Sequence, residues 1–112
     1  MITAILSDIH GNLPALEIAI KNTNDVDQYI ILGDVVNYGP WNNECVQLIE
    51  TLPNCVKILG NHDIDFINKI NLNDTSLSKE FFLKCIDNFS ESESLKKYKH
   101  EFKYNNFIFK HT

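Results

Sequence analysis

Three short polar clusters hold most of the residues in this sequence that could do chemistry. They are Asp8-Ile9-His10, Gly33-Asp34 and Gly60-Asn61-His62-Asp63. Their oxygen and imidazole ligands suit Mn, Fe, Zn or Ni better than an all-oxygen calcium site. A carboxylate that bridges two such ions holds them about 3.5–4 Å apart, lowers the pKa of a shared water and clamps a phosphoryl group. A nearby histidine that binds no ion can stabilise the transition state or protonate the leaving oxygen. The clusters therefore indicate a phosphoester hydrolase.

Each cluster follows a short apolar run that predicts a buried strand. The runs are Ile2 to Leu6, Tyr29 to Leu32 and Val56 to Leu59. They are too short and too uninterrupted for exposed helices, and the first reads as buried on both faces. Because the carboxyl ends of parallel strands meet at one edge of a sheet, where ligands bind, we expect the three clusters to converge on one site.

Amphipathic segments between the runs predict helices. Pro14 suits the first turn of the first helix, and Asn61 is placed as the N-cap of the third. The expected helices cover about residues 13–21, 41–52 and 62–70, and residues 71–75 end the third. Strands and helices then alternate, which predicts an α/β fold that begins βαβαβ with right-handed crossovers.

The pattern changes from Ser76 onward. Helical spacing of apolar residues continues to Ser90, and residues 92–97 predict a short exposed helix. Residues 98–104 and 107–109 read as a strand pair around Asn105-Asn106, which tolerates the positive φ of a tight hairpin. His100, on the first of these strands, reads as structural or solvated.

Composition limits the classes of function. The chain has 112 residues, 44% of them apolar, which predicts one soluble domain at most. A formal charge of −5 argues against a broad nucleic-acid surface but leaves small nucleotides as substrates. No apolar run approaches the roughly 18 residues of a membrane span, and no signal peptide is apparent, so we expect a cytoplasmic protein without membrane contact. The three cysteines, an odd number without C-x-x-C spacing, read as buried free thiols.

In this order and context, the clusters resemble the motifs of the calcineurin-like metallophosphoesterases. The stretches 7–13 and 33–40 are most similar to the small bacterial branch of phosphodiesterases and diadenosine tetraphosphatases. The resemblance covers roughly residues 1 to 70. It implies the βαβαβ start of an α/β/β/α sandwich, with residues 1–112 as the N-terminal part of a single metallophosphoesterase domain.

The resemblance also implies roles for individual residues. His62 would face the phosphate without binding metal, and Asp63 would orient and polarise its imidazole. The cofactors would be two divalent transition metal ions, Mn first, with Fe, Zn or Ni as alternatives. The substrate would be a phosphorylated small molecule or a nucleotide, with the choice between monoester and diester left open. The implied metal ligands are Asp8 and His10 on the first ion, Asp34 between both ions, Asn61 on the second, and His111.

The sequence departs from the family in lacking its final Gly-His-x-His block. The chain is therefore either a fragment, which we favour, or a natural half that needs a partner chain or a second copy. An isolated half would expose sheet surface and edge that the rest normally covers. Two functions follow as alternatives: a binuclear phosphoesterase, or a metal- or phosphate-binding module without turnover. A nucleotide-binding α/β domain is disfavoured, because neither G-x-G-x-x-G nor a P-loop is present. Each cluster alone could also be ordinary turn and cap chemistry.

Overall fold

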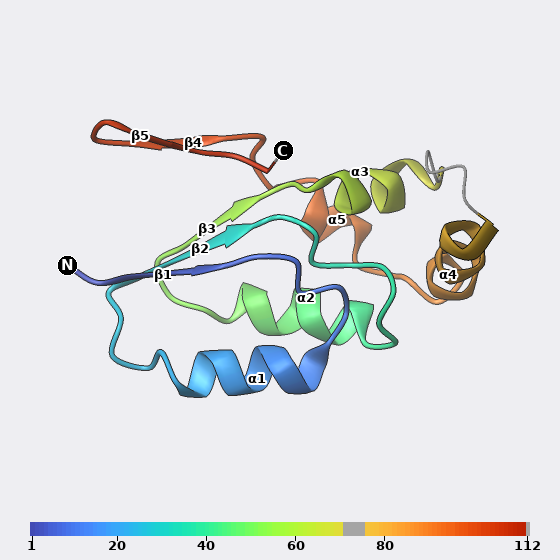
Figure 1. The fold of residues 1–112 in the computed structure, drawn as a ribbon, viewed down its shortest axis with the longest axis horizontal. Coiled ribbons are helices and arrows are strands. Elements are labelled where there is room, and N and C mark those ends of the chain that lie inside the picture. The colour runs from blue at the N-terminus through green and yellow to red at the C-terminus, as the bar shows by residue number, and fades with distance from the viewer. Residues whose placement is uncertain (71–75, 112) are drawn as a thin grey trace.

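The computed structural model describes residues 1–70 and 76–111, so the expected helix breaker at 71–75 lies outside the described residues. Strands and helices alternate through the first half of the chain, and two helices and a hairpin follow (Figure 1). In chain order the elements are β1 (Thr3–Leu6), α1 (Leu13–Lys21), β2 (Gln28–Leu32), α2 (Asn42–Glu50), β3 (Cys55–Ile58), α3 (Asn61–Asn68), α4 (Ser76–Ile86), α5 (Ser92–Leu95), β4 (Phe102–Tyr104) and β5 (Phe107–Phe109).

The main sheet has the strand order β1-β2-β3, and both pairings are parallel. Ile30, in the middle strand, pairs with Ile5 on one side and Val56 on the other. Helices α1 and α2 lie on one side of this sheet and the β4–β5 hairpin on the other (Figure 1). The predicted βαβαβ arrangement is confirmed, and all three strands direct their carboxyl ends toward the same edge.

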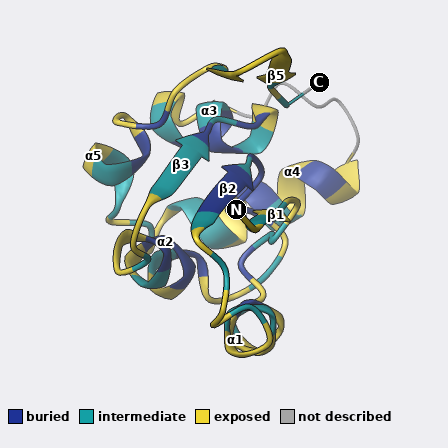
Figure 2. Cartoon of the chain, turned by 90° about the vertical axis from the view of Figure 1, so that its left-hand side faces the viewer, coloured by how far each residue is buried: buried dark blue, intermediate teal, exposed yellow. Residues whose placement is uncertain are grey.

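Burial is concentrated on β2 and the elements that cover it (Figure 2). The middle of β2 is fully buried, whereas β1 is only partly buried and Ile5 is 51% exposed. The expectation that β1 is buried on both faces is therefore wrong: Leu6 packs against the core, whereas its neighbour Ile5 points to the opposite face, which is exposed at this edge strand. The buried apolar cluster comprises Leu16, Ile31, Val35, Val36, Cys45, Val46, Ile49, Phe66, Phe82, Leu95 and Tyr98.

The ends of the first and third helices follow local backbone chemistry. Helix α1 begins as predicted, because the Asn12 side chain accepts a hydrogen bond from the Ala15 amide (3.2 Å). The expected cap of α3 at Asn61 is wrong: Gly60 is the N-cap and Asn61 is the first helical residue. Helix α3 ends with Lys69 in the left-handed conformation.

The C-terminal region differs from the expectation in two places. Helix α5 is not an exposed element, because Leu95 is fully buried in the core. Lys99 forms an isolated parallel bridge with Ile58 of β3 and does not pair in the hairpin. The Lys99 amide donates to the Lys57 carbonyl and the Leu59 amide to the Lys99 carbonyl, both at 2.8 Å. This alignment along β3 carries Tyr98 into the core and leaves only residues 102–104 to pair with β5.

Three smaller expectations can also be compared with the structure. Asn105 in the hairpin turn has a φ of 54°, as a tight turn requires. All three cysteines are free; Cys45 is fully buried and the other two are half-buried. In the part of the chain that the structure describes, every helix is too short or too polar to cross a membrane.

Candidate metal centre

Asp34 is the central residue of the site. It follows β2, is 4% exposed and has a left-handed backbone with a φ of 56°. Its Oδ1 accepts a hydrogen bond from the His62 amide at 3.0 Å. Its Oδ2 lies 3.0 Å from Nε2 of His111 and 3.9 Å from Nε2 of His10. Both oxygens of one buried carboxylate thus face groups from other loops, as a bridging ligand requires.

The loop after β1 is held against the loop after β2 by backbone hydrogen bonds. Asp8 and His10 both have positive φ, 56° and 48°, and such a conformation costs about 1–3 kcal/mol at a residue other than glycine. Strain of this kind persists only where the surroundings enforce it, and it is common at functional sites. The enforcing bonds run from the amide of Asp8 to the carbonyl of Gly33 (3.1 Å), from His10 to Asp34 (3.0 Å) and from Gly11 to Val35 (2.8 Å).

Backbone carbonyls determine how His10 and His111 present their rings. Nδ1 of His10 lies 3.1 Å from the Val36 carbonyl, and Nδ1 of His111 lies 2.8 Å from the Leu32 carbonyl. A carbonyl only accepts, so Nδ1 carries the proton in each ring and the Nε2 lone pair of the neutral imidazole faces Asp34. A lone pair and a carboxylate oxygen 3.0 Å apart repel unless a proton or a metal cation lies between them. The donor set therefore fits a divalent cation.

The pKa of His111 responds to the same surroundings. Burial lowers this pKa, but the hydrogen bond to the Leu32 carbonyl and the charges of Asp34 and Asp8 outweigh burial and raise it. At Asp8 a hydrogen bond from Ser7 is the main reason that the pKa is lowered. Both shifts favour a cation beside carboxylates.

Two groups of side chains could each hold an ion. In each group the candidate ligand atoms lie within 4.8 Å of one another, and Asp34 belongs to both. A shared aspartate was expected at this position, and its bridging role stays a prediction. The grouping differs from the expected one, which put Asp8 and His10 on the same ion, although their side chains are only 3.6 Å apart. One group is Asp8, Asp34 and His111, and the other is His10, Asp34 and His62.

Asn37 determines the proton position on His62. The Asn37 Oδ1 accepts from the Tyr38 amide at 2.9 Å, so its Nδ2 is the group that lies 3.1 Å from Nδ1 of His62. Because an amide nitrogen donates, Nδ1 of His62 is the acceptor and Nε2 of the neutral ring carries the proton. Burial is the main reason that the pKa of His62 is lowered. A neutral ring with a protonated Nε2 is a hydrogen-bond donor rather than a metal ligand.

The side chain of Asp63 does not make the contact with His62 that the sequence suggested. It was expected to orient and polarise the His62 imidazole, but in the described part of the chain the ring's hydrogen-bond partner is Asn37. The fully buried carboxylate of Asp63 accepts from backbone amides instead, and burial raises its pKa to about 6. These bonds join the β2 loop to the start of α3. The donors are the amides of Asp34 (2.9 Å), Val35 (2.9 Å), Val36 (3.2 Å) and Gly60 (2.9 Å).

Gly60 and Asn61 lie where α3 meets Asp34. A Cβ on Gly60 would collide with the Asp34 carboxylate and amide, so only glycine allows this close approach. Asn61 is exposed in the first turn of α3, next to His62. This position at the site edge is compatible with the expected ligand role of Asn61, which remains a proposal.

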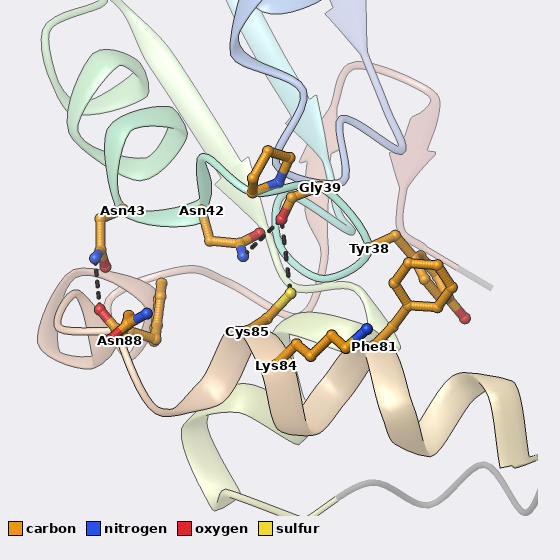
Figure 3. Close-up of a pocket in the computed structure, with 10 residues that line it drawn as sticks. Tyr38, Gly39, Asn42, Asn43, Phe81, Lys84, Cys85 and Asn88 are labelled. Atoms are coloured by element: carbon orange, nitrogen blue, oxygen red, sulfur yellow. Dashed lines mark hydrogen bonds between the residues drawn. The ribbon is translucent and has the colours of Figure 1, made fainter.

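Tyr38 is a site residue that sequence reasoning missed. Its ring makes edge-to-face contacts with His10 (centroids 5.1 Å apart), His62 (5.0 Å) and Phe81 (5.3 Å). Its place between Asn37 and Gly39-Pro40, inside the second motif region, was the available signal. Beyond this ring lies a cavity of about 300 Å³ between the β2–α2 loop and α4 (Figure 3).

Comparison with known proteins identifies the family. The family model for calcineurin-like phosphoesterases matches residues 1–112. The chain belongs to this family. Over 71 residues it is 42% identical to an uncharacterised protein of Methanocaldococcus jannaschii, a match that covers 62% of this chain and 29% of the relative. It is also 41% identical over 71 residues to a symmetrical bis(5'-nucleosyl)-tetraphosphatase of Buchnera aphidicola, with 60% and 26% covered.

Two solved structures share the fold. A metallophosphoesterase from Sphaerobacter thermophilus superposes with a TM-score of 0.81 at 28% identity, over 96% of this chain and 45% of the other. A putative diadenosine tetraphosphatase gives a TM-score of 0.70 at 24% identity, over 88% and 43%, which supports the fold alone. The chain spans under a third of these curated relatives' length and under half of these solved structures.

Proposed function

We propose that this chain forms the metal-binding part of a phosphoesterase that hydrolyses phosphomonoesters or phosphodiesters at a binuclear centre. The observation that carries the proposal is Asp34, a buried carboxylate whose Oδ2 lies 3.0 Å from Nε2 of His111 and 3.9 Å from Nε2 of His10, two ligands from separate loops. Membership of the calcineurin-like phosphoesterase family supports the reaction class.

The side chains divide into those that would hold ions and one that would act on the substrate. Divalent ions, when bound, would supply the positive charge that polarises the phosphoryl group and activates its nucleophile. His62 would donate its Nε2 proton in a hydrogen bond to a phosphoryl or leaving oxygen. Asp63 would act indirectly, because its carboxylate accepts hydrogen bonds from the backbone of the loop that carries Asp34. The proposed ligands are Asp8, His10, Asp34, Asn61 and His111.

Relatives suggest the class of substrate. Several curated relatives are named as symmetrical bis(5'-nucleosyl)-tetraphosphatases. Together with the acidic surface charge, which disfavours long nucleic acids, this supports a small nucleotide substrate.

Metal titration with a matched variant tests the proposal. Calorimetry with Mn²⁺ should detect two bound ions in the wild-type chain, and Asp34→Asn should lose at least about tenfold in affinity. Asp25→Asn removes the same charge from an exposed loop away from the site and should bind like the wild type. In Asp34→Asn, the rates of hydrolysis of a generic aryl phosphodiester and of an aryl phosphomonoester should fall together with the affinity for Mn²⁺. Unchanged binding and hydrolysis in Asp34→Asn would refute the proposal.

A binding module without turnover is the second candidate. It is favoured by the 56% exposure of the Asp8 side chain, which leaves this expected ligand open to solvent. It predicts weak binding of a single ion and no hydrolysis. Tight binding of two ions would exclude it.

A further inference from the structure

The cavity beside Tyr38 lies outside the candidate ligand groups but shares a wall with them. Tyr38 lines the cavity, and the same ring contacts the imidazoles of His10 and His62. A substrate whose phosphate lies at the ligand groups could therefore extend past this ring. At about 300 Å³ the cavity is within the size range of small-molecule sites.

The walls offer aromatic surface. Phe81 and Phe89, from α4 and the turn after it, and Pro40, from the facing loop, line the cavity with Tyr38. Figure 3 shows the Tyr38 and Phe81 rings together at one end. Aromatic faces of this kind stack on planar heterocycles without needing a particular pattern of hydrogen bonds.

Hydrogen bonds hold the opposite wall in place. Asn43 donates to the Asn88 carbonyl at 2.7 Å and accepts from the Ser90 amide at 2.8 Å, which ties the end of α4 to α2. Asn42 donates to the Gly39 carbonyl at 3.0 Å. Because these amides are already bonded, the cavity is preformed rather than created by a ligand.

Lys84 gives the cavity a positive charge. Its side chain extends along the cavity toward Phe81 (Figure 3), and among the described residues no carboxylate lies within ion-pair distance of its ammonium. An unpaired ammonium beside aromatic surface favours a ligand that is both planar and anionic.

We propose that this cavity binds the nucleoside part of a nucleotide substrate, with Lys84 on a phosphate other than the one that reacts. The assignment rests on the proposed phosphoesterase function and adds to it a binding site for the nucleoside part of the substrate. A phosphotyrosine side chain would also fill aromatic space, but its only phosphate is the reacting one, which leaves Lys84 without a partner.

Nucleoside binding without metal tests this cavity separately from hydrolysis. The ¹⁵N-labelled chain is titrated with adenosine and with ADP in the presence of a chelator, and amide shifts are followed. Adenosine should shift the amide signals of Tyr38, Phe81 and Lys84. The Phe81→Ala substitution should weaken adenosine binding at least about fivefold. Lys84→Gln should weaken the binding of ADP about two- to fivefold and leave the binding of adenosine unchanged.

Two exposed positions on the same helix supply the controls. Leu83→Ala and Lys79→Gln make the same kinds of change on α4 outside the cavity lining and should bind both ligands like the wild type. Adenosine shifts that avoid the cavity, equal effects of the Lys84 and Lys79 variants, or tighter binding of phosphotyrosine than of ADP would each overturn the proposal. Because no metal is present, a failure of the phosphoesterase proposal would leave this result unaffected.

Discussion

At the scale of single residues, Asn37 links the backbone conformation of a loop to the chemistry of His62. Asn37 is 1% exposed and has a φ of 79°, a conformation that asparagine adopts more readily than most residues. In this position its amide lies against the His62 ring. An amide adds no negative charge, so it fixes the tautomer of the imidazole without favouring the imidazolium.

Replacing Asn37 by glycine separates this role from metal binding. Glycine accepts the positive φ, so Asn37→Gly should fold, bind Mn²⁺ with unchanged stoichiometry and hydrolyse aryl phosphodiester about tenfold more slowly. Long-range ¹H–¹⁵N spectra of the metal-free chain should show Nε2–H on His62 in the wild type and a mixture of tautomers in the variant. The same single tautomer in both proteins would contradict the role given to Asn37.

Sequence patterns predicted which side chains gather around Asp34 but not which contacts hold them in place. Asp8, His10 and Asp34 were predicted from motifs and His111 from a single residue after a strand, and the structure brings their side chains close together. The role of Asp63 was misread because adjacency to His62 along the chain suggested contact, whereas α3 directs the carboxylate toward backbone amides of another loop. A contact between a side chain and a distant backbone leaves no pattern in a single sequence.

At the scale of elements, boundaries depended on tertiary contacts. The alternation of residues 98–104 suggested one long strand, yet Tyr98 packs in the main core because Lys99 pairs beside β3. The alternation of apolar and polar residues is the same whether the segment pairs beside β3 or with β5, so the sequence could not distinguish these two partners. The three parallel strands were predictable because each is a short apolar run between helical patterns.

The two cysteines of α2 and β3 give the fold a dependence on alkaline pH. Burial raises the pKa of Cys45 to about 12 and that of Cys55 to about 11, from an ordinary value of 9.0. The folded state therefore keeps these thiols protonated where the unfolded chain ionises them. The resulting stabilisation is complete below about pH 9 and is lost as the pH rises toward these values.

Urea unfolding at about pH 8 and about pH 10.5, under reducing conditions, measures this effect. The free energy of unfolding should fall between the two by up to about 1.4 kcal/mol per pH unit for each thiol. Cys45→Ala should show a shallower fall, even though its smaller side chain lowers stability at both pH values. Equal slopes in the two proteins would show that Cys45 does not contribute.

At the scale of the whole molecule, apolar surface gathers on the hairpin and on the edge strand. Phe107 is 65% exposed, Ile108 60% and Ile5 51%. Exposed apolar strands favour association between molecules. The expectation that this stretch of chain would leave sheet surface uncovered agrees with these values.

Changing the hairpin should therefore alter association and leave the fold intact. Phe107→Thr combined with Ile108→Thr places a residue with high strand propensity at both exposed positions, so the free energy of unfolding should change by less than about 1 kcal/mol. Sedimentation over a range of concentrations should show less self-association than in the wild type. If the variant and the wild type associate equally, the surface through which molecules associate lies elsewhere, and β1 is the next candidate.

The carboxylate of Asp63 also affects the order of folding. It joins amides of the β2 loop to the first turn of α3, and these groups lie 27 to 29 residues apart in sequence. Closing loops of that length in a parallel sheet is slow compared with forming a helix. The hydrogen bonds from Asp63 to the Asp34 loop can form only when β2 and α3 already lie side by side, so we expect the candidate metal centre to be completed late in folding.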